Sequence, residues 1–585
     1  MTNQDVAEKL REVFNLMQLA GENQFRAIAF DKAAQTIDGL SDDILSYIES
    51  GSLTEIKGIG KSIAEDIRLF HETGTMPVLE SLKERVPKGL IEWLNITGLG
   101  PKSISKIHQA LGITEVSELK EACISGAVAK LPGMGQKSAE KILKSIAYLE
   151  TFGERTRLDQ ALAIADPIYR FIRTLPGIVE CDIAGSLRRA RETIGDIDIL
   201  ASASKENVPA IFDAFTKHEL VVEILGRGDT KSSVRTENGR QVDLRIVKPQ
   251  EYSAALIYFT GSKEHNIVMR QRARERGMAL NEYGLYRLTS GKETDFDQPV
   301  ITTTESDIYR KLDLHFIPPE HREDRGEFTF YEENESMDLI SEEQIKGVIH
   351  AHSTWSDGKY SIADMADTSI SLGYEYLGIT DHSRTASYAG GLTIEDVKRQ
   401  WEEIDRLNDQ YRTDGLNFTI FKGIESDILS DGSLDYPDEI LEGFDLVIAS
   451  VHSGLEMPRE KMMERFRNAI LNPHTTMLGH PTGRLLLRRD GSDIELNQII
   501  EWAAETGVAI EINASPWRLD LDWRFGNKAL ECGLMSSVNP DAHTTEGIRD
   551  IRYGVMIARK AKFGPERILN SRNSVQFRRW LSEKK

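Results

Sequence analysis

The chain has 585 residues, which suggests about three to five domains. Its formal net charge of −21 and its pI of about 5.2 argue against a general nucleic-acid binder, because such proteins normally carry a basic surface. No apolar run of membrane-spanning length and no secretory signal is expected, and three scattered cysteines exclude a disulfide framework or a thiolate zinc site, which favours a reducing cytoplasm.

Residues 1–150 are expected to be helical, because apolar residues recur there at three- and four-residue spacing. One motif occurs three times in this region: IKGIGKSIAEDI at 56–67, ITGLGPKSISKI at 96–107 and LPGMGQKSAEKI at 131–142. A Gly-x-Gly between two helices allows a tight turn and presents backbone N–H groups at the next helix, where they bind phosphate without reading sequence. A single copy would also fit an ordinary helix–helix turn, but three copies with lysine or serine in the following turn favour phosphate binding.

These repeats resemble the helix-hairpin-helix motif of DNA repair proteins and polymerases. The resemblance implies a lyase-like helical DNA-binding domain at 1–90, which holds the first motif, and a second one at 91–150, which holds the other two. Backbone amides would then hold much of the phosphate, so the acidic net charge is no longer an objection. The candidate DNA contacts are the glycines and the first lysine of each repeat: Gly58, Gly60, Lys61, Gly98, Gly100, Lys102, Gly133, Gly135 and Lys137.

Residues 151–245 mix helix with short strands, and the expected strands are CDIAGS, DIDILAS, VVEILGR and RQVDLRIV. In DIDIL, Asp196 and Asp198 stand two residues apart and therefore point to the same face of the strand. Two neighbouring carboxylates repel each other, so the pair needs a cation, and oxygen ligands suit Mg²⁺ or Mn²⁺. Asp243 in VDLRI is the expected third acid on a neighbouring strand, and such a trio with two ions is what in-line nucleotidyl transfer requires.

The combination G-S-x-x-R…G-D-I-D resembles the nucleotidyltransferase superfamily, although a D-x-D pair alone would also fit a surface strand with solvated acids. The resemblance implies an α+β nucleotidyltransferase palm at 151–245. Gly185 would allow the backbone to approach a triphosphate closely, and Ser186 and Arg189 would donate hydrogen bonds to it.

The stretch YFTGSKEHNIVMRQRARERGMALNEYGLY at 258–286 resembles the family X DNA polymerases, and the resemblance covers most of residues 1–320. It implies a nucleotide-selection subdomain at 246–315. Without the family, the aromatic pair at its start would also fit a packed core. The implied roles are a sugar pocket that disfavours a 2′-OH for Tyr258 and Phe259, close approach at Gly261, a contact with the incoming base for Asn266, a template-side contact for Arg270 and a triphosphate contact for Arg155.

One position departs from the family pattern. Many family X enzymes have an amino-terminal lyase domain whose nucleophilic lysine lies on the helix after the first hairpin, and Asp66 takes that position here. A carboxylate cannot form a Schiff base, and Lys57 and Lys61 suit phosphate contacts better. We therefore expect no strong deoxyribose-phosphate lyase activity.

The pattern changes again after residue 315. Residues 316–338 are charged, contain Pro-Pro and lack periodicity, which predicts an interdomain linker. Strand-then-helix units fill 339–585, with strands in GVIHAHS, YLGITDHS, FTIFKGIESD, LVIASVHS, MLGHP, VAIEINAS and LMSSVNPDAH. Most of these strands are apolar and end in polar residues, which predicts a β/α barrel or a layered α/β domain with its site at the carboxyl ends of the strands.

Six histidines and three carboxylates stand in these strand-end motifs. One such histidine is more commonly a structural hydrogen-bonder, but nine candidate ligands at one face predict a metal cluster. Imidazole and carboxylate without cysteine suit Zn²⁺, Mn²⁺ or Fe²⁺, up to three ions, and such clusters activate water and bind a phosphoryl group. The candidate ligands are His350, His352, Asp357, His382, Glu425, His452, His480, Asp541 and His543.

The order of these motifs resembles the PHP (polymerase and histidinol phosphatase) domain, and the full ligand set implies an active phosphoesterase with a distorted β/α barrel. Together the resemblances imply a bacterial family X DNA polymerase that fills gaps in DNA base excision repair. Its PHP domain would act as a 3′–5′ exonuclease, with 3′-phosphatase and abasic-site endonuclease as further activities. The expected substrates are gapped or primed duplex DNA and deoxynucleoside triphosphates, and we expect a cytoplasmic, nucleoid-associated monomer that binds no membrane.

Two other functions fit parts of the sequence. A non-templated nucleotidyltransferase with a small-molecule phosphatase domain would have both ligand sets, but the three hairpins and the YFTGS motif speak against it. A DNA-end-binding scaffold without catalysis would need neither ligand set, and both sets are intact.

Overall fold

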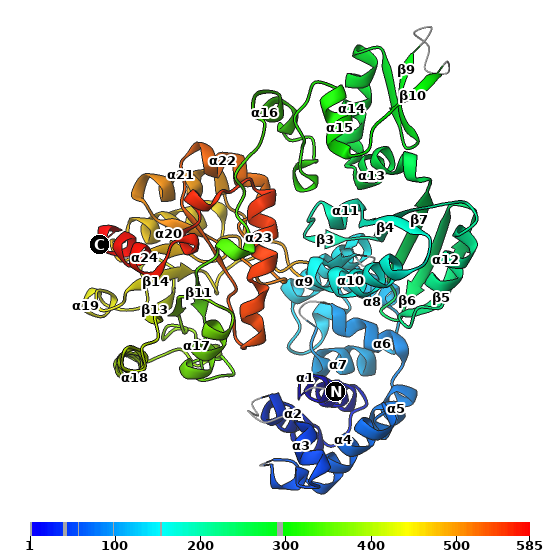
Figure 1. Ribbon diagram of the computed structural model, residues 1–585. Helices are drawn as coiled ribbons and strands as arrows, with labels where there is room; N and C mark the ends of the chain where they lie inside the picture. Colours follow the sequence, from blue (N-terminus) through cyan, green and yellow to red (C-terminus); the bar gives the residue numbers. More distant parts are fainter. Residues whose placement is uncertain are drawn as a thin grey trace. The chain divides into compact units, whose positions relative to one another are not determined.

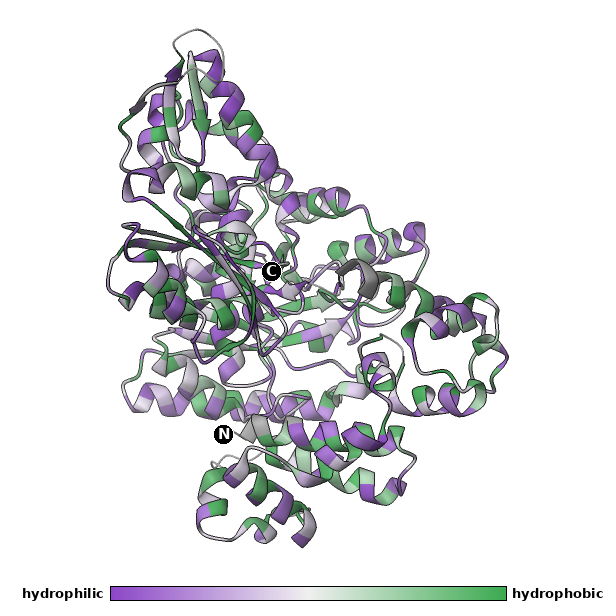
Figure 2. Cartoon of the chain, turned by 90° about the vertical axis from the view of Figure 1, so that its right-hand side faces the viewer, coloured by the Kyte–Doolittle hydropathy of each residue, from purple (hydrophilic) through white to green (hydrophobic). Residues whose placement is uncertain are grey.

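The computed structural model describes residues 3–38, 44–56, 58–96, 99–152, 155–288 and 296–584. Within these ranges no helix has both the length and the apolar character needed to cross a membrane. Hydrophilic and hydrophobic residues alternate along most helices, as expected for helices that pack on one side only (Figure 2). The chain divides into two compact units, one formed by residues 1–153 and the other by nearly all of the remainder.

The first unit is helical throughout its described residues. Its apolar side chains form one core, in which Trp93, Ile104 and Ile107 are fully buried. The helices are α1 (Asn3–Leu19), α2 (Gln24–Asp38), α3 (Ile44–Glu49), α4 (Lys61–Thr73), α5 (Pro77–Arg85), α6 (Lys88–Glu92), α7 (Pro101–Leu111), α8 (Val116–Ile124) and α9 (Gln136–Phe152) (Figure 1).

The second unit begins with the palm, a five-stranded sheet in the order β2-β4-β7-β6-β5, in which only β4 and β7 are parallel. The four expected strands are present, and β6 (KSSVRT) is an additional one. A short pair, β1 with β3, lies outside the sheet. The elements are β1 (Thr156–Arg157), α10 (Leu158–Thr174), β2 (Ile178–Ile183), α11 (Gly185–Arg188), β3 (Thr193–Ile194), β4 (Ile197–Ala203), α12 (Val208–Phe215), β5 (Val221–Arg227), β6 (Lys231–Thr236) and β7 (Gln241–Val247).

A small subdomain follows the palm, with an antiparallel sheet in the order β10-β9-β8 and a core of its own. The segment that was expected to be an aperiodic linker, residues 316–338, contains a 3₁₀ turn (Pro319–His321) and α16, and the side chain of Arg322 within it is fully buried. This connecting segment is therefore folded against its neighbours. The elements are α13 (Tyr252–Thr260), α14 (Lys263–Glu275), β8 (Met278–Asn281), β9 (Gly284–Leu288), β10 (Phe296–Val300), α15 (Glu305–Lys311) and α16 (Glu327–Glu333).

The rest of the chain forms a parallel barrel of seven strands, which pair in sequence order from β11 to β17. All seven strands expected from the sequence are present, and a bridge between Ala351 and Ala542 brings the first and last strand ends together, so the barrel is nearly closed. The strands are β11 (Gly347–Ala351), β12 (Tyr376–Ile379), β13 (Thr419–Asp427), β14 (Leu446–Ser450), β15 (Met477–Leu478), β16 (Ala509–Asn513) and β17 (Ser536–Asn539).

Helices surround these strands (Figure 1). They are α17 (Ile362–Ser371), α18 (Ile394–Thr413), α19 (Asp438–Leu441), α20 (Arg459–Leu471), α21 (Leu496–Thr506), α22 (Gly526–Glu531), α23 (Ile551–Lys560) and α24 (Ser574–Lys584). The predicted fold class is thus confirmed: a helical amino-terminal region, an α+β palm and a carboxyl-terminal α/β barrel.

Candidate active sites

Three aspartates meet near the amino-terminal ends of the two parallel strands of the palm sheet. Asp196 precedes β4, Asp198 is its second residue, and Asp198 stands opposite Asp243 on the parallel strand β7. One carboxylate oxygen from each lies within 4.8 Å of the others. Burial, reinforced by the charges of Asp196 and Asp243, raises the pKa of Asp198 to about 7. The trio repels itself in the absence of a cation, so its carboxylates fit divalent ions.

Two features of this aspartate site were not predicted from the sequence. Lys231 on the unexpected strand β6 places its Nζ 2.6 Å from Asp243 Oδ2. Gly185 has a φ of +61°, and a Cβ atom at this position would lie only 2.2 Å from Asp198 Oδ2. The side chain of Asp198 therefore requires a glycine here, whereas the sequence suggested only a close approach to triphosphate.

The arginines predicted to contact triphosphate are held by protein groups. Arg189 donates from Nε to Glu323 Oε1 at 3.1 Å and from Nη1 to the Thr260 carbonyl. Arg155 donates from Nε to Thr193 Oγ1 at 2.9 Å. Burial is the largest influence that lowers the pKa of Arg155. Ser186 is half-buried on α11, directly after Gly185, the residue that lies against Asp198.

Three of the predicted nucleotide contacts, Tyr258, Asn266 and Arg270, line one shallow pocket that is open to solvent. Asn266 Nδ2 donates to the Tyr258 carbonyl at 2.8 Å, which orients the amide. Phe259 is not part of the pocket lining: its ring meets the edge of Tyr258 at 5.0 Å between centroids, and the guanidinium of Arg245 lies 4.2 Å from it.

Gly261 directly follows α13. Gly261 has a φ of +71°, and a Cβ atom here would lie 3.1 Å from Arg189 Nη1. The glycine therefore leaves room for the arginine that reaches the Thr260 carbonyl, in addition to any room it leaves for a nucleotide.

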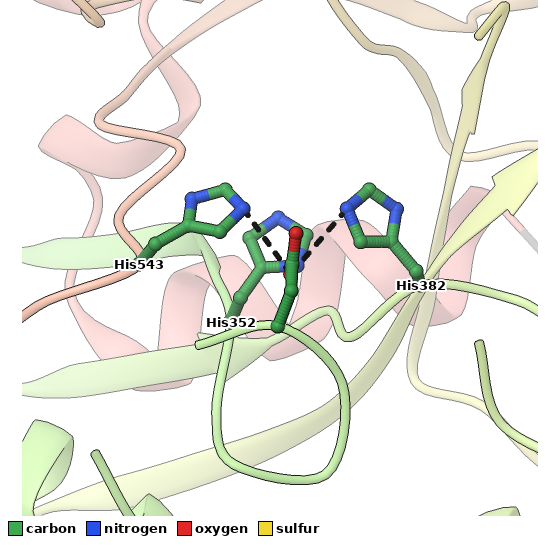
Figure 3. A group of neighbouring side chains, drawn as sticks. His352, His382 and His543 are labelled. Atoms are coloured by element: carbon green, nitrogen blue, oxygen red, sulfur yellow. Dashed lines mark ion pairs between the residues drawn. The ribbon is translucent and has the colours of Figure 1, made fainter. Parts of the chain in front are cut away.

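The nine ligand candidates of the barrel gather at the carboxyl ends of its strands. Eight of them form three overlapping groups in which one donor atom per residue lies within 4.8 Å of the others. The rings of His352, His382 and His543 turn toward one point, where their nitrogens lie 3.9, 3.6 and 3.3 Å from Asp357 Oδ1 (Figure 3). His480 lies outside the groups, but its Nε2 is 2.9 Å from Glu425 Oε1. The groups are His352, Asp357, His382 and His543; His350, His352 and Asp541; and His382, Glu425 and His452.

Buried donor atoms at this site fit metal ions. Among the described residues, His382 Nδ1 lies 3.0 Å from Glu425 Oε2, and His350 Nε2 and His352 Nδ1 are buried without a hydrogen-bond partner. Such atoms are rare unless a ligand satisfies them. Burial, with His543 and His382 nearby, lowers the pKa of His352 to about 3, so its imidazole is neutral and offers a lone pair. The donor set of imidazole and carboxylate fits divalent transition metals.

Two buried carboxylates that sequence reasoning missed support these histidines. Glu511, fully buried on β16, accepts from His350 Nδ1 at 2.6 Å and from the backbone N–H of His480 at 2.9 Å. Asp427, at the end of β13, accepts from His452 Nδ1 at 2.5 Å. Carboxylates in this position fix the ring orientation of metal-binding histidines. An acid in the otherwise apolar strand AIEIN was the signal that could have identified Glu511.

The helix-hairpin-helix repeats have the expected geometry in the first unit. Gly60 and Gly100 are the last residues before α4 and α7, and Gly135 directly precedes α9. Gly58 and Gly133 have φ values of +94° and +75°, which only glycine adopts readily. Lys61, Lys102 and Lys137, in the first turns of these helices, are exposed.

Asp66 lies half-buried on α4, and burial raises the pKa of its carboxyl. Gly98 and Lys57 lie outside the described residues.

An aspartate trio on a mixed sheet and a histidine-rich barrel define a class of protein: a nucleotidyltransferase joined to a metal-dependent phosphoesterase. Family comparisons agree with this class. A DNA polymerase beta thumb matches residues 255–323, a PHP domain matches 349–515, a helix-hairpin-helix domain matches 1–76 and a SAM-like helix-hairpin-helix tandem matches 91–147.

Individual relatives narrow the class to one family. The DNA polymerase/3′-5′ exonuclease PolX of Bacillus subtilis (strain 168) is 40% identical over 575 residues, which are 98% of each chain. The DNA polymerase lambda of Rattus norvegicus is 25% identical over 343 residues, 55% of this chain and 56% of that one. A probable phosphatase of Thermoanaerobacter sp. (strain X514) is 27% identical over 248 residues, 40% of this chain and 94% of that one. The chain belongs to the PolX family, the family X DNA polymerases that carry a PHP domain.

Proposed function

We propose that this protein is a DNA-directed DNA polymerase that fills short gaps during DNA repair and also shortens DNA from its 3′ end. The co-occurrence of the aspartate trio and the barrel cluster in one chain carries the proposal: the three carboxylates lie together, eight of the barrel residues form ligand groups, and His480 contacts Glu425. The similarity along 98% of the PolX relative supports both activities.

In the polymerase site, Asp196, Asp198 and Asp243 would hold two Mg²⁺ or Mn²⁺ ions. These ions supply activation of the primer 3′-OH and charge neutralisation on the leaving pyrophosphate. Ser186 and the nearby arginines bind the triphosphate, and Arg189 reaches phosphate oxygens with Nη2 while its Nε and Nη1 keep their protein acceptors. Tyr258 and Phe259 select the sugar, while Asn266 and Arg270 read the base and the template side of their shared pocket.

In the barrel, the nine strand-end residues would hold up to three Zn²⁺ or Mn²⁺ ions. These ions supply activation of water and a clamp on the phosphoryl group. Glu511 and Asp427 hold the rings of His350 and His452 in place. The reaction is 3′–5′ exonucleolysis of phosphodiesters, with abasic-site endonuclease as a further phosphodiester hydrolysis and 3′-phosphatase as hydrolysis of a phosphomonoester.

The remaining proposals concern partners and organisation. The hairpin glycines and lysines bind the phosphates of gapped or primed duplex DNA through helix N-termini and exposed ammonium groups. The protein acts as a monomer in the cytoplasm, at the nucleoid. Its parts are the DNA-binding regions at 1–90 and 91–150, the palm at 151–245, the nucleotide-selection subdomain at 246–315, the connecting segment at 316–338 and the PHP domain at 339–585.

The test follows primer extension and primer shortening in one reaction on gapped DNA with Mg²⁺ or Mn²⁺. Asp196→Ala should abolish extension and leave shortening, and the double variant His350→Ala with His352→Ala should do the reverse. Loss of both activities in either variant would refute the assignment of two separate sites. Incorporation on tRNA or on small alcohols instead of gapped DNA would favour a non-templated nucleotidyltransferase.

A further inference from the structure

Lys560 is a buried cation at the end of α23 in the PHP domain. Its side chain is 0% exposed, and its ammonium group lies 4.2 Å from the Trp523 ring. The group donates to the carbonyls of Arg189 and Glu320 at 2.8 and 3.0 Å, and to Glu323 Oε1 at 2.8 Å. All three hydrogens of the ammonium group are therefore used, and two of the three acceptors belong to the connecting segment.

The third acceptor belongs to the palm and stands next to the polymerase site. Arg189 directly follows α11, the short helix that starts with Gly185 and carries Ser186. The start of this helix is tied to the aspartates, because the N–H of Ala184 donates to the Asp198 carbonyl at 2.8 Å. A bond to the Arg189 carbonyl thus restrains the end of a turn whose beginning lies against Asp198.

Glu323 joins Lys560 to the side chains of the same turn. One oxygen of its carboxylate accepts from both Lys560 Nζ and Arg189 Nε, and the other accepts from Arg191 Nη1 at 3.2 Å. The Glu323 side chain is 7% exposed, so it interacts with these cations through protein rather than through water. Burial opposes the ionisation of Glu323, but Lys560 and Arg189 outweigh it and lower its pKa.

We propose that Lys560 is a positioning residue for the polymerase reaction. It is supplied by the PHP domain and acts through the Arg189 carbonyl and the Glu323 carboxylate on the turn that binds the triphosphate. This inference rests on the proposed polymerase function. Lys560 touches neither nucleotide nor DNA; it fixes where Ser186 and Arg189 stand when the nucleotide arrives.

The electrostatics of the contact support this role. Burial lowers the pKa of Lys560 to about 8, although Glu323 acts in the opposite direction. Removing one partner of a buried ion pair leaves the other charge uncompensated, so Lys560 and Glu323 hold each other in place. Removal of Lys560 would leave Glu323 with only the arginines as partners and the Arg189 carbonyl with one donor fewer, so the turn would relax.

The decisive variant is Lys560→Met, which keeps the stem of the side chain and removes the charge. The control is Lys528→Met, which removes a PHP lysine that pairs with Glu501. We expect Lys560→Met to raise the KM for the incoming deoxynucleotide in a single-nucleotide gap about tenfold. The exonuclease rate should stay within about twofold of wild type, and Lys528→Met should change neither quantity.

A purely structural role would give a different pattern. A destabilised protein loses active molecules, which lowers kcat for extension and the exonuclease rate together and leaves KM unchanged. An unchanged KM in soluble Lys560→Met would therefore overturn the inference. Absence of extension by the wild-type protein would instead overturn the proposed function itself.

A second variant covers the case in which Lys560→Met does not fold. Glu323→Gln weakens the same contact from the side of the connecting segment, because it removes the charge that pairs with Lys560 and Arg189. It should therefore also raise the KM for the incoming deoxynucleotide. A lower KM in Glu323→Gln would overturn the inference, since it would mean that Glu323 competes with the triphosphate for Arg189. In the double variant, Lys560→Met with Glu323→Gln, the KM increases should be less than multiplicative because both residues act through one contact.

Discussion

Gly185 lies directly against the Asp198 carboxylate at the polymerase site. A Cβ atom at position 185 would approach Asp198 Oδ2 to 2.2 Å, whereas ordinary contacts begin at 3.4 Å. In Gly185→Ala the carboxylate must therefore move by about 1.2 Å, away from the place where it faces Asp243. Displacement by about 1 Å at a reacting centre costs roughly 100-fold in rate, or about 3 kcal/mol.

The backbone makes a second contribution that has to be separated from the first. Gly185 has a φ of +61°, and a left-handed backbone costs an alanine about 1 kcal/mol of stability. Gly239 offers a matched control, because it has a φ of +74° in the turn between β6 and β7 and nothing lies within 4 Å of its Cβ direction. Gly239→Ala therefore carries the backbone strain without the collision.

The assay is single-nucleotide gap filling, with thermal unfolding and exonuclease activity measured on the same preparations. Both alanine variants should lose about 1 kcal/mol to backbone strain, Gly185→Ala should lose more because of the collision, and both should retain the exonuclease. Gly185→Ala should lose about 100-fold in kcat/KM for nucleotide incorporation, while Gly239→Ala should stay within about threefold of wild type. Incorporation by Gly185→Ala within threefold of Gly239→Ala would refute the reasoning, because Asp198 would then have moved aside without consequence.

Three further predictions follow from the pKa directions and the buried carboxylates. Because the pKa of Asp198 is about 7, its carboxyl is mostly protonated at pH 6 and mostly ionised at pH 8. Mg²⁺ binding should therefore release about one more proton from wild type than from Asp198→Asn at pH 6, and almost the same number from both at pH 8. An equal difference in proton release at the two pH values, measured by calorimetry, would contradict this. Glu511→Gln leaves His350 without its carboxylate, so the metal content after dialysis should show a PHP affinity that is about 10- to 100-fold weaker, with unchanged gap filling. Burial, with Asp159 nearby, raises the pKa of Asp550 from 3.8 to about 7. The protonated carboxyl therefore stabilises the folded state at low pH, and this stability is lost as the pH rises from 3.8 to about 7. Asp550→Asn should consequently raise the melting temperature more at pH 8 than at pH 5.

Short-range patterns in the sequence predicted most of the fold. The alternation in DIDIL and the apolar runs that end in histidine or acid identified β4 and all seven barrel strands, because side-chain period and strand ends are local properties. The strand β6 was missed because KSSVRT has little apolar character. It forms because it pairs on both edges, with β5 and β7, and that pairing is a property of the sheet.

The candidate site was predictable for residues that would touch a ligand and unpredictable for those that touch only other residues. Asp196, Asp198 and Asp243 occur in a recognisable pattern, but the ion pair of Asp243 with Lys231 depends on the missed strand. The same holds for the connecting segment. Its charges and prolines suggested a solvated linker, yet buried Arg322 pairs with Glu305 at 2.7 Å, which sequence periodicity cannot show.

The two consecutive arginines after Gly185 and Ser186 show how the palm depends on the rest of the second unit. Arg188 pairs with Glu305 at 2.7 Å, and Arg189 pairs with Glu323 at 3.1 Å. Neither carboxylate belongs to the palm, and both stand more than a hundred residues later in the chain. The turn that would bind the triphosphate is thus held from outside, once by the small subdomain that follows the palm and once by the connecting segment. Lys560 joins the PHP domain to the second of these contacts. A change in how the PHP domain packs should therefore weaken nucleotide binding before it displaces the aspartates.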